Sequence, residues 1–499
     1  MRQTKRLLLT GLGRVVGAGG AVGALALSAA FLSGCTVGPN YARPEIEAPV
    51  SWRIDYEQAA GVANLRWWEQ FGDPALNQLI DESLRANRDL LAAAARVDQF
   101  IGALSTTQAQ FYPQIGYGAD ASRNRSSRVA QPPIAPGGDA YYSLYQATLG
   151  AQWQIDLFGR VRRQSEAAQA QVFASEQGRR GVILTVVSSM AASYVGLRAL
   201  DRQLDIARAA AENYAKTFRL FELRFKGGVV SRVELAQVES QYQQALAAIP
   251  SLEQRIAAQE NLISVLRGRN PGPVPRGKTI DELVVPVIPT DLPSTLLERR
   301  PDILQAEQNL VAVNANIGVA RSLYYPTLSL TGVLGTASTA FGDLLSAPAT
   351  LGTLAAGVAG PIFSFGLIEG QVRSAEAAQR EALAFYQQAI LAALRETNDA
   401  LVGSAKTRDA AAAQARRVAA LRDYARLSRL KFDNGYADYI EVLYAENELF
   451  SAELAAVTSQ ADRFTQLVNV YRAFGGGWID EAGKVAPTPQ LAAASEPPR

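Results

Sequence analysis

The sequence predicts a duplicated fold that combines long α-helices with membrane β-strands, four strands in each chain. Three observations carry this prediction. Short motifs recur in the same order in the two halves of the chain, two helical segments are far longer than a globular core needs, and four segments have the length of membrane strands. Four strands cannot close a barrel, since single-layer barrels begin at about eight strands. The prediction is therefore a trimer that closes a twelve-stranded barrel.

The internal repeat is visible in pairs of motifs. Residues 87–91 (Asn-Arg-Asp-Leu-Leu) are matched by residues 300–304 (Arg-Pro-Asp-Ile-Leu), and residues 111–113 (Phe-Tyr-Pro) by residues 324–326 (Tyr-Tyr-Pro). The two pairs have the same separation along the chain, as a duplication requires. The expected division is repeat 1 at 74–270 with a β-hairpin at 114–153, a linker at 271–293, repeat 2 at 294–475 with a β-hairpin at 326–363, and an equatorial or disordered tail at 476–499, its disordered part starting at Ala482.

In each repeat, helices are expected both before and after the strands. Asp73-Pro74 is a typical helix start, and one helix is expected from there to Phe111, where Pro113 stops it. The later helices are expected at Gly159–Phe225, Ser231–Arg267, Gly366–Phe432 and Asp438–Arg472. A helix of about 65 residues would extend for ~100 Å, which favours a coiled coil over a globular core.

A heptad seam supports the coiled coil. From Ile183 to Phe225, apolar residues recur at alternating three- and four-residue steps, with Ser193 as the exception. The second repeat keeps the seam less cleanly, with Thr397, Ser404 and Gln414 at the matching positions. An ordinary buried helix stripe would give the same pattern over a short segment, and the length of the helices favours the coiled coil.

The four expected strands are Gln114–Ala121, Tyr142–Trp153, Pro326–Leu334 and Leu351–Phe363. Each is close to the roughly ten residues that cross a bilayer as a tilted strand. Aromatic residues gather at the strand ends, as in the aromatic girdles of membrane barrels: Tyr112, Tyr117, Tyr141, Tyr142, Tyr145, Trp153, Tyr324 and Tyr325. A small soluble sheet covering the helices is the alternative interpretation.

The N-terminus is expected to be a secretory signal at residues 1–34, with four basic residues before an apolar, Gly/Ala-rich run. The signal ends in Leu32-Ser33-Gly34-Cys35, which resembles a bacterial lipobox and would make Cys35 the lipid-modified first residue of the mature chain. Thr36 follows, which by resemblance to bacterial lipoproteins favours the outer membrane. Residues 35–73 would then be a lipidated segment leading into an equatorial belt. After residue 34 no run approaches the roughly 18 continuous apolar residues of a membrane helix.

Composition excludes several classes of function. The chain has no His and one Cys, so it lacks the residues for Cys/His zinc sites, Ser-His-Asp catalysis and His-ligated haem. With 49 Lys and Arg against 47 Asp and Glu, it has no charge excess that would indicate nucleic acid. Residues 272–279 fit the P-loop pattern, but Pro273 and Pro275 remove backbone donors that a phosphate cradle needs. We expect no catalytic residue, no metal and no cofactor beyond a covalent lipid on Cys35.

Motifs along the whole mature chain resemble the NodT-like lipoprotein branch of TolC-type outer-membrane factors, which pair with RND efflux pumps. They are Cys35-Thr-Val-Gly-Pro-Asn-Tyr41, residues 67–76 (Trp-Trp-Glu-Gln-Phe-Gly-Asp-Pro-Ala-Leu), residues 298–303 (Glu-Arg-Arg-Pro-Asp-Ile), residues 317–320 and residues 360–366. The resemblance implies a homotrimer with a twelve-stranded barrel in the outer membrane, continuous with a twelve-helix coiled-coil tunnel in the periplasm. It also implies a passive exit duct for small molecules, docked to a periplasmic adaptor and an inner-membrane RND-type pump.

The resemblance also assigns roles to the helix tips. Gly227-Gly228 and Asn434-Gly435 mark the two hairpin turns that would face the adaptor, although they would serve equally as plain helix–helix turns. Glu441 matches an acidic constriction position of the family, and the next such position, usually Asp, is Tyr444. We therefore expect a periplasmic gate at Glu441 and Tyr444, with a solvated helix-face Glu as the alternative. The Arg that latches some relatives is replaced by Ala437, which weakens the transfer of one particular gate mechanism.

Three other functions compete with the efflux channel. The outlet of a type I protein secretion system is the nearest, and the lipobox and the Cys-Thr-Val-Gly-Pro start favour efflux over it. A lipid-anchored coiled-coil scaffold without a pore would not explain two matched hairpins in two repeats. A periplasmic enzyme using Asp and Glu would need a compact domain to hold a pocket, which the element pattern does not provide.

Overall fold

The computed structural model describes residues 36–45, 65–127, 139–286, 288 and 296–491. The chain divides into two compact units, each built from separate stretches. The first unit comprises Met1–Pro44, Phe100–Val172 and Gln308–Ala384, and the second comprises Glu45–Gln99, Phe173–Glu307 and Phe385–Arg499. The expected signal segment and Cys35 lie outside the described residues.

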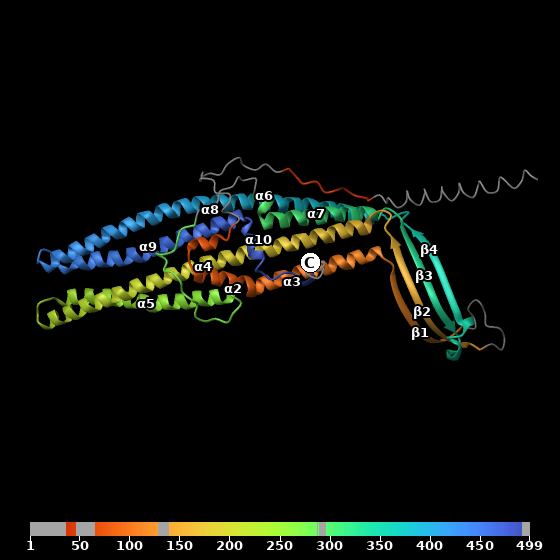
Figure 1. Cartoon of the computed structure of the whole chain (residues 1–499), viewed down its shortest axis with the longest axis horizontal. Helices are drawn as coiled ribbons and strands as arrows, with labels where there is room; N and C mark the ends of the chain where they lie inside the picture. Colours follow the sequence, from red (N-terminus) through yellow and green to blue (C-terminus); the bar gives the residue numbers. More distant parts are fainter. Residues whose placement is uncertain (1–35, 46–64, 128–138, 287, 289–295, 492–499) are drawn as a thin grey trace, which may run out of the picture. The chain divides into compact units, whose positions relative to one another are not determined.

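The first unit contains an antiparallel sheet whose strands lie side by side in chain order (Figure 1). In the described residues the strands are β1 Gln114–Arg125, β2 Tyr141–Ile155, β3 Thr327–Ser338 and β4 Thr350–Ala359. The four expected strands are all present, with different ends. β1 continues to Arg125 because its polar end still pairs with β2. β4 ends at Ala359, before the expected Phe363, because Pro361 has no N–H to donate to a sheet.

The helix expected from Asp73 to Phe111 is two helices, α2 Pro74–Ala86 and α3 Arg88–Gln108, followed by the 3₁₀ turn Ala109–Phe111. The break lies at Asn87, which has extended backbone angles. Its side-chain oxygen accepts the N–H groups of Asp89 at 2.9 Å and Leu90 at 3.2 Å, as a helix-capping Asn does. The single-helix prediction was wrong because this cap lies between two helix-forming stretches.

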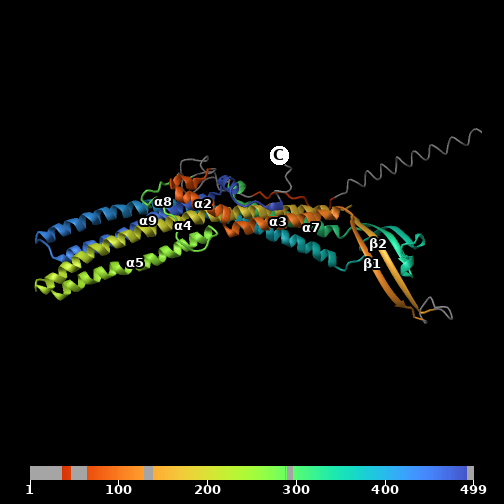
Figure 2. The same cartoon turned by 60° about the horizontal axis from the view of Figure 1, so that its bottom comes forward.

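The remaining helices follow the expected order. They are α4 Arg160–Lys226, α5 Arg232–Leu266, the short α6 Leu296–Arg299, α7 Pro301–Ser322, α8 Leu367–Asp433, α9 Tyr439–Phe474 and α10 Trp478–Gly483, with a 3₁₀ helix at Trp67–Phe71. Both α4 and α8 are 67 residues long. In Figures 1 and 2 the α4–α5 and α8–α9 turns lie at the same end of the second unit.

The heptad seam of α4 is buried as predicted, from Ile183 at 0% exposure to Phe221 at 1%, except that Phe218 is only half-buried. Its last member, Phe225, is 39% exposed, so the buried seam ends one step earlier than expected. By length and composition α4 could cross a membrane, but 67% of its most apolar stretch is buried inside the protein. Packing therefore accounts for its apolar character. In α8, the seam residue Thr397 is fully buried and donates its hydroxyl to the carbonyl of Ala393 at 2.9 Å.

An aromatic cluster forms part of the core of the second unit. Trp67 stacks on Tyr471 at 4.8 Å between ring centroids and meets the edge of Trp478 at 6.0 Å. The chain after α10 is also ordered as far as Leu491, where disorder was expected from Ala482. Arg179 donates to the carbonyl of Pro487 at 3.1 Å, and the Leu491 N–H donates to an Asp98 carboxylate oxygen at 2.8 Å.

Candidate functional site

One face of the sheet is mostly polar and the other is mostly apolar. Because side chains alternate along a strand, the register of the strands assigns each residue to a face. The polar face carries Gln114, Asp120, Ser122, Asn124, Gln146, Thr148, Gln152, Gln154, Thr327, Ser329, Thr331 and Thr353. The apolar face carries Ile115, Tyr117, Ala119, Ala121, Tyr145, Leu149, Trp153, Ile155, Leu328, Leu330, Leu334, Leu354 and Val358. Exceptions include Leu144, Val333 and Leu351 on the polar face and Ser143, Thr336, Ser338 and Thr350 on the apolar face. This alternation is that of a strand between lipid and a polar lumen.

The sheet also has two open edges. Within the described part of the chain, β1 pairs only with β2, and β4 only with β3. Side chains on both edge strands are strongly exposed, with Tyr117 at 90% and Leu354 at 89%. An open, apolar edge strand is a template for pairing with another chain, so this sheet is built to continue into a partner.

The expected helix tips form two matching turns. Gly228 donates its N–H to the carbonyl of Phe225 at 3.0 Å, and Gly435 donates to the carbonyl of Phe432 at 3.0 Å. Both glycines have left-handed backbone angles, with φ of +72° and +77°. Gly227 and Asn434 precede them at equivalent positions. Each tip therefore needs one residue that tolerates positive φ, and glycine supplies it in both.

The helices that leave the two turns are capped differently. At the start of α5, Ser231 and Glu234 form a capping box, in which the Ser231 hydroxyl accepts the Glu234 N–H at 3.2 Å and the Glu234 carboxylate accepts the Ser231 N–H at 2.6 Å. At the start of α9, Asp438 is the N-cap residue but its side chain accepts no capping hydrogen bond. The α8–α9 turn therefore lacks a stabilising feature that the α4–α5 turn has.

Large apolar side chains are exposed at both tips. They are Leu223, Val229 and Val233 at 66–74% exposure in the first hairpin, and Leu430, Tyr436 and Ile440 at 55–85% in the second. Exposed apolar residues grouped in this way are typical of a protein–protein contact surface rather than of a solvated helix end.

The two expected gate residues lie on α9 in different surroundings. Glu441 is held by the facing helix α8, where Lys431 makes a 3.2 Å ion pair with its carboxylate and Ser428 donates to the same oxygen at 3.2 Å. Tyr444 is 62% exposed and lines a shallow pocket with Leu443 and polar residues of α5. The charge of Glu441 is thus partly balanced within its own hairpin, whereas Tyr444 is open to solvent.

A second acidic residue of α9, which the sequence analysis missed, is more deeply buried. The Glu446 side chain is 14% exposed, and its nearest cation, Arg429 of α8, is 3.9 Å away. One of its carboxylate oxygens has no hydrogen-bond partner among the described residues. Burial raises the pKa of Glu446, and Arg429 opposes this only in part.

The first described residues of the chain are held by a buried arginine that sequence reasoning also missed. We call residues 36–40 the anchor segment. Arg163, on the first turn of α4, has a side chain that is 5% exposed. It donates to the carbonyls of Val37 at 3.2 Å and Gly38 at 3.3 Å, to the Asn40 side chain at 2.8 Å, and to Glu166 at 2.7 Å.

Two further contacts fix the anchor segment. The Val37 N–H donates to the carbonyl of Phe158 at 3.2 Å, and Asn314 of α7 donates to the carbonyl of Pro39 at 3.2 Å. Gly38 is pressed against Gly318, where a Cβ would lie 2.4 Å from the Gly318 Cα. Arg163 is one of several arginines at the start of α4, and nothing in its local pattern distinguishes it. Gly38 and Gly318 were the only residues here whose type could have indicated a close contact between the two segments.

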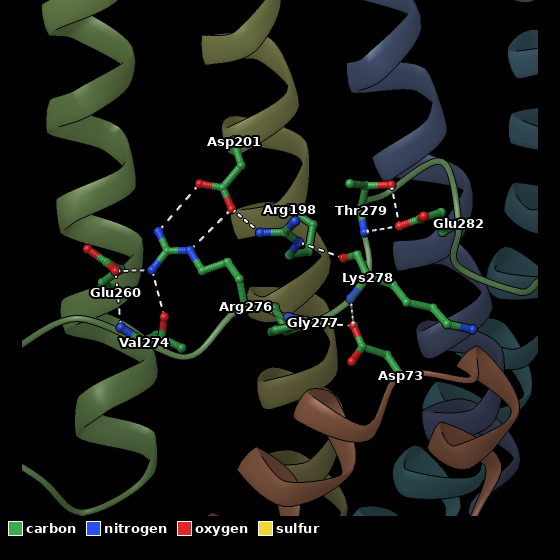
Figure 3. A network of polar contacts seen from close by, with 11 residues as sticks. Asp73, Arg198, Asp201, Glu260, Val274, Arg276, Gly277, Lys278, Thr279 and Glu282 are labelled. Atoms are coloured by element: carbon green, nitrogen blue, oxygen red, sulfur yellow. Dashed lines mark hydrogen bonds and ion pairs between the residues drawn. The ribbon is translucent and has the colours of Figure 1, made fainter.

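The P-loop-like segment is occupied by the protein's own side chains (Figure 3). The N–H of Gly277 donates to the Tyr194 hydroxyl at 2.9 Å, and the N–H of Lys278 donates to the Asp73 carboxylate at 2.9 Å. Asp73 also accepts the Tyr194 hydroxyl at 2.7 Å. Burial and the adjacent Asp73 raise the pKa of Tyr194. These two backbone donors bind a tyrosine hydroxyl and a carboxylate inside the second unit and are not available to a phosphate.

The same linker is tied to the helices by further polar contacts. Arg276 pairs with Asp201 of α4 at 3.3 Å and also with Glu260 of α5, while Arg198 donates to the Lys278 carbonyl at 2.8 Å (Figure 3). The segment between the repeats therefore has a structural role, because it links α4 and α5 through these contacts. Among the described residues no group of three or more His, Cys, Asp or Glu residues is arranged to hold a metal ion.

Comparison with known proteins agrees with this arrangement. Residues 79–269 and 292–476 match the family described as outer membrane efflux protein. The chain is 31% identical over 468 residues to the probable efflux pump outer membrane protein TtgC of Pseudomonas putida KT2440, covering 92% of this chain and 96% of that protein. It is 29% identical over 463 residues to the probable outer membrane lipoprotein SilC of Salmonella typhimurium, covering 91% and 99%.

A solved structure gives the same result at the level of the fold. The open state of the Neisseria gonorrhoeae MtrE outer membrane channel matches with a TM-score of 0.81 and 28% identity, covering 91% of this chain and 100% of that one. The two matched segments of the family correspond to the two halves of the internal repeat. This chain therefore belongs to the outer membrane efflux protein family and is the outer-membrane channel of an efflux system.

Proposed function

We propose that three copies of this chain close a passive exit duct, through which small molecules such as drugs and toxic compounds leave the cell. The observation that carries this proposal is the sheet, which has an apolar face, a polar face and two open edges. Pairing β4 of one copy with β1 of the next would give twelve strands around a polar lumen, and this removes every exposed edge.

The native mass of the detergent-extracted protein, corrected for bound detergent, tests this closure. Three copies are expected, together with stepwise conductance when the protein is reconstituted into planar bilayers. A folded monomer would contradict the proposal, because its four strands cannot enclose a pore. A trimer without conductance would contradict the duct and favour the lipid-anchored scaffold.

The lipid anchor forms a second part of the proposal. We infer that Cys35 carries the lipid, since it ends the lipobox-like sequence Leu32-Ser33-Gly34-Cys35. The name of the relative SilC, an outer membrane lipoprotein, supports this assignment. Metabolic labelling with a palmitate analogue should mark the parent protein and leave Cys35→Ser unlabelled. Label retained in Cys35→Ser would contradict the assignment. No other cofactor is needed for passive export.

The partners follow from the two tips. We infer that Gly227-Gly228 and Asn434-Gly435 present the exposed apolar residues around them to a periplasmic adaptor, which connects the duct to an inner-membrane RND-type pump. A photo-crosslinking residue at Val229, 74% exposed, should capture the adaptor in cells. The same residue at Lys216, whose side chain is 70% exposed on α4, is the matched control. Equal capture at both positions would contradict docking through the tips.

The gate remains a proposal for Glu441 and Tyr444. In a trimer, three exposed Tyr444 rings and three Glu441 carboxylates would narrow the entrance and favour cations. Lys431 lowers the net charge of such a ring, so we expect the double variant Glu441→Ala/Tyr444→Ala to raise conductance more than it changes cation preference. Unchanged single-channel conductance and cation preference would exclude this gate.

A further inference from the structure

The apolar face of the sheet changes character at the strand ends that lie far from the helices. β1 starts just after the 3₁₀ turn that follows α3, so its C-terminal end is the far end. Along the apolar face, β1 carries Ile115, Tyr117, Ala119 and Ala121, and the next two residues on that face are Arg123 and Arg125. At about 3.3 Å per residue, the distance from Ile115 to Arg123 is roughly 26 Å before strand tilt. At the strand tilt of about 35–45° in outer-membrane barrels, this run spans roughly 20 Å of membrane, which is most of their ~25 Å apolar band.

The two arginines share one aromatic neighbour. Tyr141 of β2 pairs directly with Arg125, and Ser143 pairs with Arg123. The guanidinium carbons of Arg123 and Arg125 are 6.0 and 5.5 Å from the centroid of the Tyr141 ring. Arg123 also contacts the Ser143 hydroxyl at 3.4 Å. The apolar run of β1 thus ends in two cationic groups beside a tyrosine ring.

Within the described residues, no carboxylate neutralises this positive charge. Among the described residues neither Arg123 nor Arg125 makes an ion pair with a carboxylate, and both are exposed. Asp139 is near in sequence, but one of its carboxylate oxygens accepts the Tyr141 N–H at 2.9 Å. Asp120 lies on the polar face, on the other side of the sheet. Most guanidinium donors of the pair are therefore free to bind an anion.

We propose that Arg123, Arg125 and Tyr141 bind the phosphate end of an outer-leaflet glycolipid, lipid A, whose acyl chains lie on the apolar face below them. An apolar band that ends in two guanidinium groups complements a ligand with acyl chains at one end and a phosphate at the other. A guanidinium fork matches a phosphate bidentately, and the tyrosine offers an amphipathic surface to the sugar. This inference rests on the proposed function, because it requires the far strand ends to face the outer leaflet.

Native mass spectrometry of the detergent-extracted trimer, titrated with purified lipid A, tests the proposal. The double variant Arg123→Gln/Arg125→Gln should bind lipid A roughly tenfold or more weakly than the parent, because charged hydrogen bonds to the phosphate are lost. Lipid A without its phosphates should bind the parent as weakly as intact lipid A binds the variant. The control Lys406→Gln/Arg416→Gln removes the same charge from exposed positions on α8 and should bind as the parent does.

Three outcomes would overturn the proposal. The Arg123→Gln/Arg125→Gln variant could bind lipid A as tightly as the parent, or the α8 control could lose as much affinity for lipid A as that variant does. Phosphatidylglycerol could also displace lipid A from the parent as effectively as lipid A itself. The last would mean that the surface binds any anionic headgroup. The same spectra report the number of chains in each complex. If the parent is a conducting trimer that binds no lipid A, the lipid A site is refuted and the proposed exit duct is not affected. If the parent is a monomer, the duct itself fails.

Discussion

Replacing Arg163 by alanine should release the anchor segment from the first unit while leaving the rest of that unit folded. Arg163 provides three hydrogen bonds to the segment, to the carbonyls of Val37 and Gly38 and to the side chain of Asn40. Hydrogen bonds to charged groups contribute about 1.5–3 kcal/mol each, and three that share one side chain are not additive. Because the freed carbonyls can be hydrated after release, the loss should be about 3 kcal/mol, below the summed range of about 4.5–9 kcal/mol.

A change of about 3 kcal/mol raises the open population of the segment by roughly a hundredfold. Hydrogen exchange measured by mass spectrometry on the lipidated trimer reports it, because the Val37 N–H is protected only while it donates to the Phe158 carbonyl. Its exchange should accelerate by roughly that factor in Arg163→Ala.

The matched control is Arg179→Ala. Arg179 is another buried arginine of α4, and it donates to the carbonyl of Pro487. That variant should accelerate exchange after Pro487 and leave Val37 protected. Unchanged protection of Val37 in Arg163→Ala, with the trimer intact, would refute the reasoning that this arginine holds the anchor segment.

Four further variants test other features. Gly277→Ala should lower the Tm, because its Cβ would lie 2.0 Å from the Asp73 carboxylate, and overpacking of this kind typically costs about 1–3 kcal/mol. Glu446→Gln should be more stable than the parent at neutral pH. Because the pKa of Glu446 is raised in the folded state, the parent loses stability as pH rises through that pKa. The stability advantage of Glu446→Gln over the parent should therefore disappear as pH falls towards 4.5, the ordinary pKa of a glutamate. Ser231→Ala should destabilise its hairpin by about 1 kcal/mol, and Asp438→Ala by less.

For each of these predictions, one result would contradict it. A Cβ added at Gly272 meets nothing within 4 Å, so Gly272→Ala is the control for Gly277→Ala, and equal Tm changes would rule out the steric account. For Glu446→Gln, thermal unfolding at several pH values would show a pH-independent difference if the carboxylate were not the cause. For the caps, a larger loss in Asp438→Ala than in Ser231→Ala would contradict the asymmetry between the hairpins.

Much of the fold was predictable because it is encoded by periodic signals. The heptad positions from Ile183 onward set the buried side of α4, and the strand segments were recognisable from their length and from the aromatic residues at their ends. The ends of elements were less predictable. Asn87 divides one expected helix into two through hydrogen bonds of its own side chain. The sequence does not show whether an asparagine within a helix-forming stretch will cap a new helix or remain inside one.

The functional residues divide in the same way. Glycines that require positive φ can be located from local sequence, and Gly228 and Gly435 take the conformation expected of them. The residues missed by sequence analysis, Arg163 and Glu446, depend on contacts between distant segments. Whether an arginine at the start of a helix is solvated or buried against a strand of chain more than a hundred residues earlier is decided by tertiary packing, which no local pattern records.

The composition of the first unit from three separate stretches has a consequence for how the protein is made. An exported chain emerges N-terminus first, so residues up to Pro44 and then Phe100–Val172 reach the periplasm before Gln308–Ala384. During that interval β2 lacks its partner β3, and its apolar face and open edge are exposed to other chains. The topology therefore creates a delay in which the half-made sheet must be kept from aggregating, and the delay lengthens with every residue inserted between the two repeats.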